Sequence, residues 1–172
     1  MGDFLGHIEL ESTVDFHVFC ESTAGVPTDA SSDPTYKIYG SSGPMSNGTG
    51  TTTEAETGSV ADATNATPIN IQSTAHGLVT GQNVTVASVG GNTAANGTFD
   101  VTKVDADNFT LDSSVGNGAY TSGGLWHVTG FYSGSHSILA ANGYDRSERY
   151  RIVYSATVSS AAVQDVDNFE VV

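Results

Sequence analysis

Basic residues are scarce in this sequence. Its 172 residues include only five Lys and Arg against 19 Asp and Glu, which gives a formal net charge of −14. Nucleic-acid binding is driven by Lys and Arg side chains that displace counterions from phosphates. Anionic membrane surfaces attract the same two residue types. The composition therefore predicts that neither nucleic acid nor a membrane is a partner, and an acidic surface of this kind stays soluble until it meets a complementary one.

Cysteine is almost absent as well. Cys20 is the only one, so the chain cannot form an internal disulfide. It follows Val14, Phe16 and Val18 at every second position, which predicts a small buried hydrophobic side chain. A catalytic thiol is the weaker alternative, because a reactive thiolate needs an electropositive setting.

Long apolar runs and helical periodicity are both missing. No run approaches the length that spans a membrane, and no signal peptide precedes Asp3, so we expect synthesis in a cytoplasm without secretion. Twenty glycines, with abundant Thr, Ser and Asn, favour turns and strands over long helices. The sequence predicts an all-β protein, with one ordinary domain or two small ones.

The stretch 75–126 has the most regular pattern. Apolar residues alternate with polar ones in the runs 83–87, 98–103 and 108–112, as in half-buried antiparallel strands. Gly90-Gly91, Asn96-Gly97 and Asn117-Gly118 separate the runs and supply residues that tolerate positive φ. This stretch alone reads as a complete small β-domain.

Four motifs in this stretch carry a resemblance to a known family. HGLVTGQNVTV (76–86), GNTAANGTF (91–99), VDADNFTL (104–111) and GNGAYTSGG (116–124) resemble a small β-barrel-like module that recurs in structural proteins of tailed bacteriophages. That module is distantly similar to a domain of ubiquitin-activating enzymes. The resemblance covers about sixty residues. It implies a spacer or interaction module, because the family has no catalytic residues that could be transferred.

The flanking segments carry a second resemblance. VDFHVFCES (14–22), TGFYSGSHSILAANGY (129–144), RYRIVYSATVSS (149–160) and DNFEVV (167–172) resemble an immunoglobulin-like β-sandwich of phage tail, baseplate and other virion proteins. In that pattern TGFY lies close behind the preceding strand, whereas here the small module intervenes. We therefore predict a discontinuous immunoglobulin-like β-sandwich, residues 1–64 and 129–172, with a small β-barrel-like module, residues 65–128, inserted in one loop. The segment 40–53 fits either a long exposed hairpin or a flexible loop, another strand fits within 51–60, and 61–67 reads as a linker into the module.

No constellation of residues predicts an enzyme, a cofactor site or a metal site. His7, His17, His76, His127 and His136 lack the spacing of zinc ligands. Two similar acidic segments, 105–108 and 165–168, each precede a Phe and are expected to be solvated turns, with a surface calcium ion as the alternative. The expected chain is thus non-enzymatic and has no cofactor.

Candidate subunit contacts come from two places. Arg146, Arg149 and Arg151 form the only basic cluster and could pair with an acidic neighbouring subunit, although local ion pairs with Asp145 and Glu148 explain them equally well. Phe4 and Leu5 lie in a short apolar patch that fits an edge strand or an arm. Trp126, Phe131, Tyr132 and Tyr144 are candidates for stacking on sugars, but aromatic residues at strand positions more often belong to a core.

Together these features predict a structural protein of a phage virion, made in the host cytoplasm. The expected place is the outer capsid surface, as a decoration or cement protein that bridges capsid subunits, because the chain is small, acidic and built of two compact modules. The expected partners are the chain itself, as a homotrimer or another cyclic homo-oligomer, and the major capsid protein or other virion proteins. A tail, baseplate or neck component is the first alternative. A carbohydrate-binding adhesion module on the virion is the second.

Overall fold

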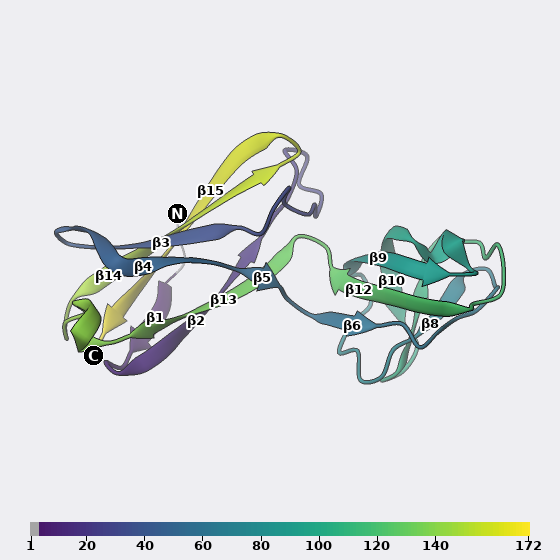
Figure 1. Cartoon of the computed structure of the whole chain (residues 1–172), viewed down its shortest axis with the longest axis horizontal. Helices are drawn as coiled ribbons and strands as arrows, with labels where there is room; N and C mark the ends of the chain where they lie inside the picture. Colours follow the sequence, from purple (N-terminus) through teal and green to yellow (C-terminus); the bar gives the residue numbers. More distant parts are fainter. Residues whose placement is uncertain (1–3) are drawn as a thin grey trace. The chain divides into compact units, whose positions relative to one another are not determined.

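The computed structural model describes residues 4–172 and divides them into two compact units. One unit comprises residues 4–53 together with Gly130–Val172, and the other comprises Glu54–Thr129. Figure 1 shows that strands make up nearly all regular structure in both units. The predicted all-β fold, a discontinuous sandwich with an inserted module, is confirmed.

A five-stranded sheet forms one layer of the sandwich. Its order is β1 (Phe4–Ile8), β15 (Ala161–Val171), β14 (Arg149–Val158), β3 (Thr35–Gly40) and β4 (Gly43–Thr51). β1 runs parallel to β15, and all other neighbours are antiparallel. Within the segment 40–53, for which hairpin and loop were both open, residues 40–51 form the turn and the second strand of a hairpin between β3 and β4.

The second layer has three strands, in the order β2 (Ser12–Phe19), β13 (Phe131–Ile138) and β5 (Thr53–Glu54). The two sheets and their connections give an immunoglobulin-like sandwich, in which consecutive strands often belong to different sheets. The chain leaves the sandwich after β5, forms the inserted unit and re-enters the sandwich at β13. β5 and β13 are neighbours in the same sheet. An insertion between adjacent strand ends leaves the sandwich intact.

Tyrosines supply much of the sandwich core. Five of them are buried between the sheets, and every one has its hydroxyl in a hydrogen bond: Tyr36, Tyr132, Tyr144, Tyr150 and Tyr154. The Tyr150 hydroxyl accepts a hydrogen bond from the backbone N–H of Asp145, 2.8 Å away. Tyr150 lies near the start of β14 and bonds to the backbone a few residues upstream. This arrangement is the tyrosine corner of immunoglobulin-like folds.

The inserted unit is a single curled sheet of seven strands. Its order is β6 (Thr57–Ser59), β12 (Ser122–Val128), β9 (Asn83–Gly90), β10 (Gly97–Lys103), β11 (Asn108–Leu111), β8 (Ile69–Gln72) and β7 (Asp62–Ala63). The two edge strands, β6 and β7, follow each other directly in the chain. One short segment therefore pairs with both ends of the sheet and curls it into a barrel-like shape.

That pairing moves the boundary between the two units. The predicted boundary lay at residue 65, but the inserted unit begins at Glu54 because β6 pairs with β12 and β7 pairs with β8. The end of the unit at Thr129 lies one residue from the predicted end. The sequence indicates a linker over 61–67 and leaves open another strand within 51–60. In the structure β6 lies in the segment 51–60, and β7 lies in the expected linker.

Three aromatic rings lie directly over glycines of the neighbouring strand. The pairs are Tyr36 with Gly50, Trp126 with Gly58, and Phe16 with Gly134, and each is a registered cross-strand pair. A methyl group added at these glycines would lie 2.5–2.7 Å from ring atoms. Glycine thus creates the space that each ring fills, and the ring covers backbone that the glycine leaves exposed.

Candidate functional site

Two of the three predicted arginines lie on the outer face of the five-stranded sheet. Arg149 and Arg151 alternate with the buried Tyr150 and Ile152 along β14, so both point away from the core. Arg151 is registered with Tyr39 of β3 on one side, and Arg149 with Glu170 of β15 on the other. Directly registered residues share a face of a sheet, so these four side chains form one surface.

Lys37 belongs to the same surface. It is registered with Val153 of β14, and like Arg151 it is exposed. The Lys37 ammonium lies 5.7 Å from the centre of the Tyr39 ring, and the Arg151 guanidinium lies 5.0 Å from it. Both distances fall in the range of cation–π attraction, so two positive charges lie close to the Tyr39 ring. We call Lys37, Tyr39, Arg149 and Arg151 the basic face.

The basic face differs in sign from the rest of its unit. Residues 1–53 and 130–172 hold twelve of the 19 acids and four of the five bases, a net charge of −8. Three of those bases lie on the basic face, and Glu170 is the one acid that the register places beside them among the described strands of this sheet. Glu170 accepts a hydrogen bond from Arg149 Nε at 3.2 Å, while the Arg149 side chain stays 81% exposed.

Two shallow hollows flank the Tyr39 ring. One, of about 460 Å³, is lined by Lys37, Tyr39, Thr49 and Thr51 of β3 and β4 and reaches Gln164 of β15. The other, of about 270 Å³, lies beside Arg149, Arg151 and Asn168. The basic face therefore combines two hollows, exposed hydrogen-bond donors and a half-buried aromatic ring.

The remaining predicted contact residues lie elsewhere. Arg146 is exposed in the turn before β14, outside the strands. Phe4 is 55% exposed at the edge strand β1, where it is registered with Asn168 and so shares the outer face. Leu5 turns the other way and packs against the sandwich core. The predicted edge strand is thus present, but only one of its two apolar residues is available for a partner.

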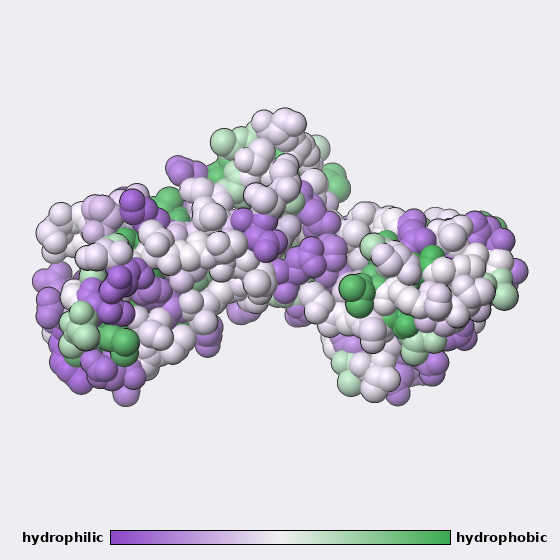
Figure 2. Space-filling model, viewed as in Figure 1, coloured by the Kyte–Doolittle hydropathy of each residue, from purple (hydrophilic) through white to green (hydrophobic). Residues whose placement is uncertain are grey.

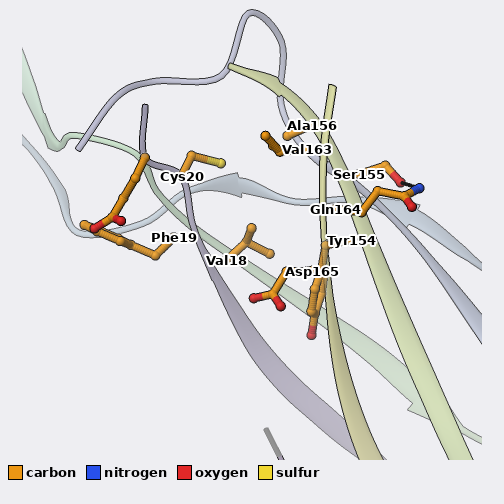
Figure 3. A pocket seen from close by; sticks show the side chains of 10 residues that line it. Val18, Phe19, Cys20, Tyr154, Ser155, Ala156, Val163, Gln164 and Asp165 are labelled. Carbon is orange, nitrogen blue, oxygen red and sulfur yellow. Dashed lines mark hydrogen bonds between the residues drawn. The ribbon is translucent and has the colours of Figure 1, made fainter. Parts of the chain in front are cut away.

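A second hollow region lies at the open edge of the sandwich. Figure 3 shows Val18 and Cys20 from the β2 side pointing toward Ala156 and Val163 of the β14–β15 hairpin. This cavity measures about 200 Å³. Burial, and then the charge of Asp29, raise the pKa of the Cys20 thiol, which keeps it protonated. The prediction of a buried Cys20 is confirmed, with the side chain 3% exposed.

The two acidic segments differ from each other. Asp105 is a turn residue, as predicted: its carboxylate accepts hydrogen bonds from the backbone N–H of Asp107 and the side chain of Asn108, which lower its pKa. Segment 165–168 lies inside β15, so the predicted turn there is wrong. Asp167 faces the core and accepts a hydrogen bond from the Tyr154 hydroxyl at 2.8 Å. No three His, Cys, Asp or Glu side chains in residues 4–172 are grouped as metal ligands would be.

The motif residues of the inserted unit are occupied in holding it together. The buried Asn92 donates from Nδ2 to the carbonyls of Ala63 and Thr64, and its Oδ1 accepts from the backbone N–H of Asn117. Asn96 accepts from the N–H of Val89 and donates to the carbonyl of the same residue. These asparagines tie distant loops to strand β9 and to the edge strand β7.

His76 has a similar structural role. Its Nδ1 accepts the N–H of Leu78 at 3.0 Å, and its Nε2 lies 3.0 Å from the carbonyl of Asp105. Only the neutral imidazole with its proton on Nε2 satisfies both contacts. The ring also packs edge-on against Phe109, which in turn packs against Trp126. His76 therefore ties the His-Gly-Leu turn to the core.

Three of the four aromatic residues considered for sugar stacking are buried, and the fourth is half-buried. Trp126, Tyr132 and Tyr144 are at most 2% exposed, which confirms the expectation of core positions. Phe131 is half-buried on the outer face of β13, where it stacks on His17 at 5.2 Å between ring centres. Figure 2 shows hydrophobic surface on the viewed face only as small separate patches. In residues 4–172 no helix is both long and apolar enough to cross a membrane.

Comparison with known proteins gives only distant structural likenesses. No model of a protein family matches the sequence, and no curated protein is detectably similar in sequence. A family 123 glycoside hydrolase from Clostridium perfringens superposes over 100% of this chain and 23% of its own, with 9% identity and a TM-score of 0.28. The collagen-binding subdomain of the Enterococcus faecalis surface protein ACE superposes over 95% of this chain and 92% of its own, with 11% identity and a TM-score of 0.22. Superpositions this loose carry no argument about function.

Proposed function

We propose that this protein is a non-enzymatic structural component of a tailed-phage virion, and that it decorates the outer capsid surface. One observation carries the proposal: the motifs that resemble the phage module consist of residues that bond and pack within the module. Asn92 and Asn96 hold loops to strands, and His76 holds a turn. A motif kept for internal bonding suits a rigid spacer displayed on a particle.

The basic face offers one of the protein–protein contacts that such a component needs. A cement protein stabilises a shell when it buries surface across the seams between capsid subunits, so that release of one subunit must also break those contacts. Tyr and Arg are among the residues most enriched at the centres of such interfaces. Tyr39, Arg149 and Arg151 present these side chains on one sheet, with Phe4 at its edge.

The proposal is tested on particles assembled without this chain. We expect them to form but to release their DNA at a lower temperature or in a milder osmotic shock, and we expect purified protein added back to restore resistance. Add-back of a Lys37→Gln/Arg151→Gln variant should restore less resistance than wild type. Particles of equal resistance with and without the chain would rule out a cement role. A failure to assemble tails would place the protein in the tail, baseplate or neck.

A further inference from the structure

We propose that the basic face binds the acidic surface of a second copy of this chain, in a head-to-tail contact. This inference rests on the proposed structural role and names the partner of the same face. The charges on the chain carry it. Lys37, Arg149 and Arg151 are three of only five bases, whereas the other surfaces carry nearly all of the 19 acids. A copy of the chain is thus itself a partner of complementary charge.

The composition of the face fits a protein partner. Tyr39 contacts both Lys37 and Arg151 through cation–π attraction, which restrains the ring before a partner binds. The half-buried Val153 and Val166 are registered with each other on β14 and β15, in the middle of the same surface. An apolar centre with Tyr and Arg around it is the arrangement of protein interfaces.

The charges also determine the symmetry of the contact. A two-fold contact places the same surface of both copies against each other. Here that would bring Lys37 and Arg151 of one copy toward the same cations of the other, which costs free energy. A head-to-tail contact places these cations against carboxylates instead. Such contacts close into rings when the rotation permits, which agrees with the cyclic oligomer expected from the sequence.

Glu170 limits the strength of the face. Its carboxylate already accepts a hydrogen bond from Arg149, and it is the one acid registered among the three cations in the described sheet. A second copy must therefore compete for Arg149. Replacing Glu170 with Gln would release that guanidinium and make the face more positive by one charge.

Sedimentation velocity of the purified chain, over a range of concentrations and at low and high salt, tests this inference. We expect reversible association that salt weakens, because exposed charges are screened. Lys37→Gln/Arg151→Gln should raise the dissociation constant about two- to fivefold for each ion pair lost. The control variant Lys103→Gln/Arg146→Gln removes the same charge from outside the face and should associate like wild type or more tightly.

A gain of association is predicted at Glu170. Glu170→Gln should lower the dissociation constant about two- to fivefold, whereas Glu148→Gln, which removes an exposed acid from the preceding turn, should change it less. Circular dichroism of each variant confirms that it is folded. If Glu148→Gln and Glu170→Gln strengthened association equally, the effect would come from net charge and the assignment to this face would be wrong.

A mixing experiment separates the two symmetries. Fluorescently labelled Lys37→Gln/Arg151→Gln protein keeps its acidic surface, so it should co-sediment with an excess of unlabelled wild type. A head-to-tail contact predicts the same affinity per contact that labelled wild-type protein shows. A two-fold contact sets the altered face of the variant against the basic face of wild type, so it predicts a changed affinity per contact. That result, or a chain that stays monomeric at low salt, would overturn the inference. If the chain associates as described but is absent from purified particles, the inference stands and the proposed function fails.

Discussion

At the residue scale, the polar groups of the sandwich core are paired with one another. His136 lies between two tyrosines, with Nδ1 3.2 Å from the Tyr36 hydroxyl and Nε2 3.0 Å from the Tyr144 hydroxyl. Burial lowers the pKa of His136 below its ordinary value of 6.5. The neutral imidazole is therefore the form that the folded core accepts.

This pairing predicts how stability depends on pH. Because the folded pKa is lowered, the unfolded chain binds more protons than the folded chain between the two pKa values. The contribution of His136 to the free energy of unfolding should be fully present above pH 6.5 and fall as the pH drops from 6.5 through the folded pKa. In His136→Gln this part of the dependence should be missing. Urea unfolding of both proteins at about pH 8 and about pH 5 measures the difference, and equal losses in both would contradict the account.

Sequence alone locates many of these core residues but not their partners. The alternation of Tyr150, Ile152 and Tyr154 correctly predicts that all three are buried. The prediction of a solvated turn at Asp167 is wrong. An Asp-x-Asp-Asn segment favours a turn, but Tyr154 lies on a neighbouring strand and donates a hydrogen bond that makes burial of one carboxylate acceptable. A contact between residues distant in the sequence thus outweighs a local preference.

At the element scale, glycines beneath aromatic rings fix how strands pair. We expect Gly50→Ala, Gly58→Ala and Gly134→Ala each to lower the free energy of unfolding by about 1–3 kcal/mol, because the added methyl overlaps a buried ring. Gly40→Ala is the milder control. Its nearest contacts are 3.2 and 3.3 Å, and one of them is the flexible end of Met45.

The single tryptophan makes this prediction specific to one unit. Trp126 is the one tryptophan of the sequence and belongs to the inserted unit, so the sandwich has none. Urea unfolding followed by tryptophan fluorescence should therefore shift for Gly58→Ala, whose methyl would meet the Trp126 ring. In Gly134→Ala the shift should appear in the circular dichroism of the whole chain, to which the sandwich contributes, and not in tryptophan fluorescence. Equal fluorescence shifts in both variants would show that the units unfold together.

Strand pairing also explains what the sequence could not predict about the basic face. Arg149 and Arg151 are visible as a cluster because they lie close together in one strand. Lys37 and Tyr39 lie more than a hundred residues away, and they join the cluster only through the register between β3 and β14. The alternation in 35–40 does place both opposite the buried Tyr36 and Ile38. The alternation does not show which strand pairs with 35–40.

At the scale of the whole molecule, the two units differ in the charge of the surfaces that they carry. The sandwich carries the basic face, while the inserted unit has a core of its own and hydrogen-bonded loops. The inserted unit holds seven acids and one base, a net charge of −6, so it is also a source of acidic surface. In an assembly of many copies, the basic face of one copy would bind the acidic surface of the next, as we propose above.

The measurement that tests the central claim most directly is the number of copies of this chain in each purified phage particle, from quantitative mass spectrometry against the major capsid protein. We predict a copy number comparable with that of the capsid protein, as expected of a decoration protein on every capsid facet. A copy number that is only a small multiple of the tail symmetry would contradict the capsid assignment in favour of the tail or neck. Particles that lack the chain altogether would contradict the proposal of a virion component.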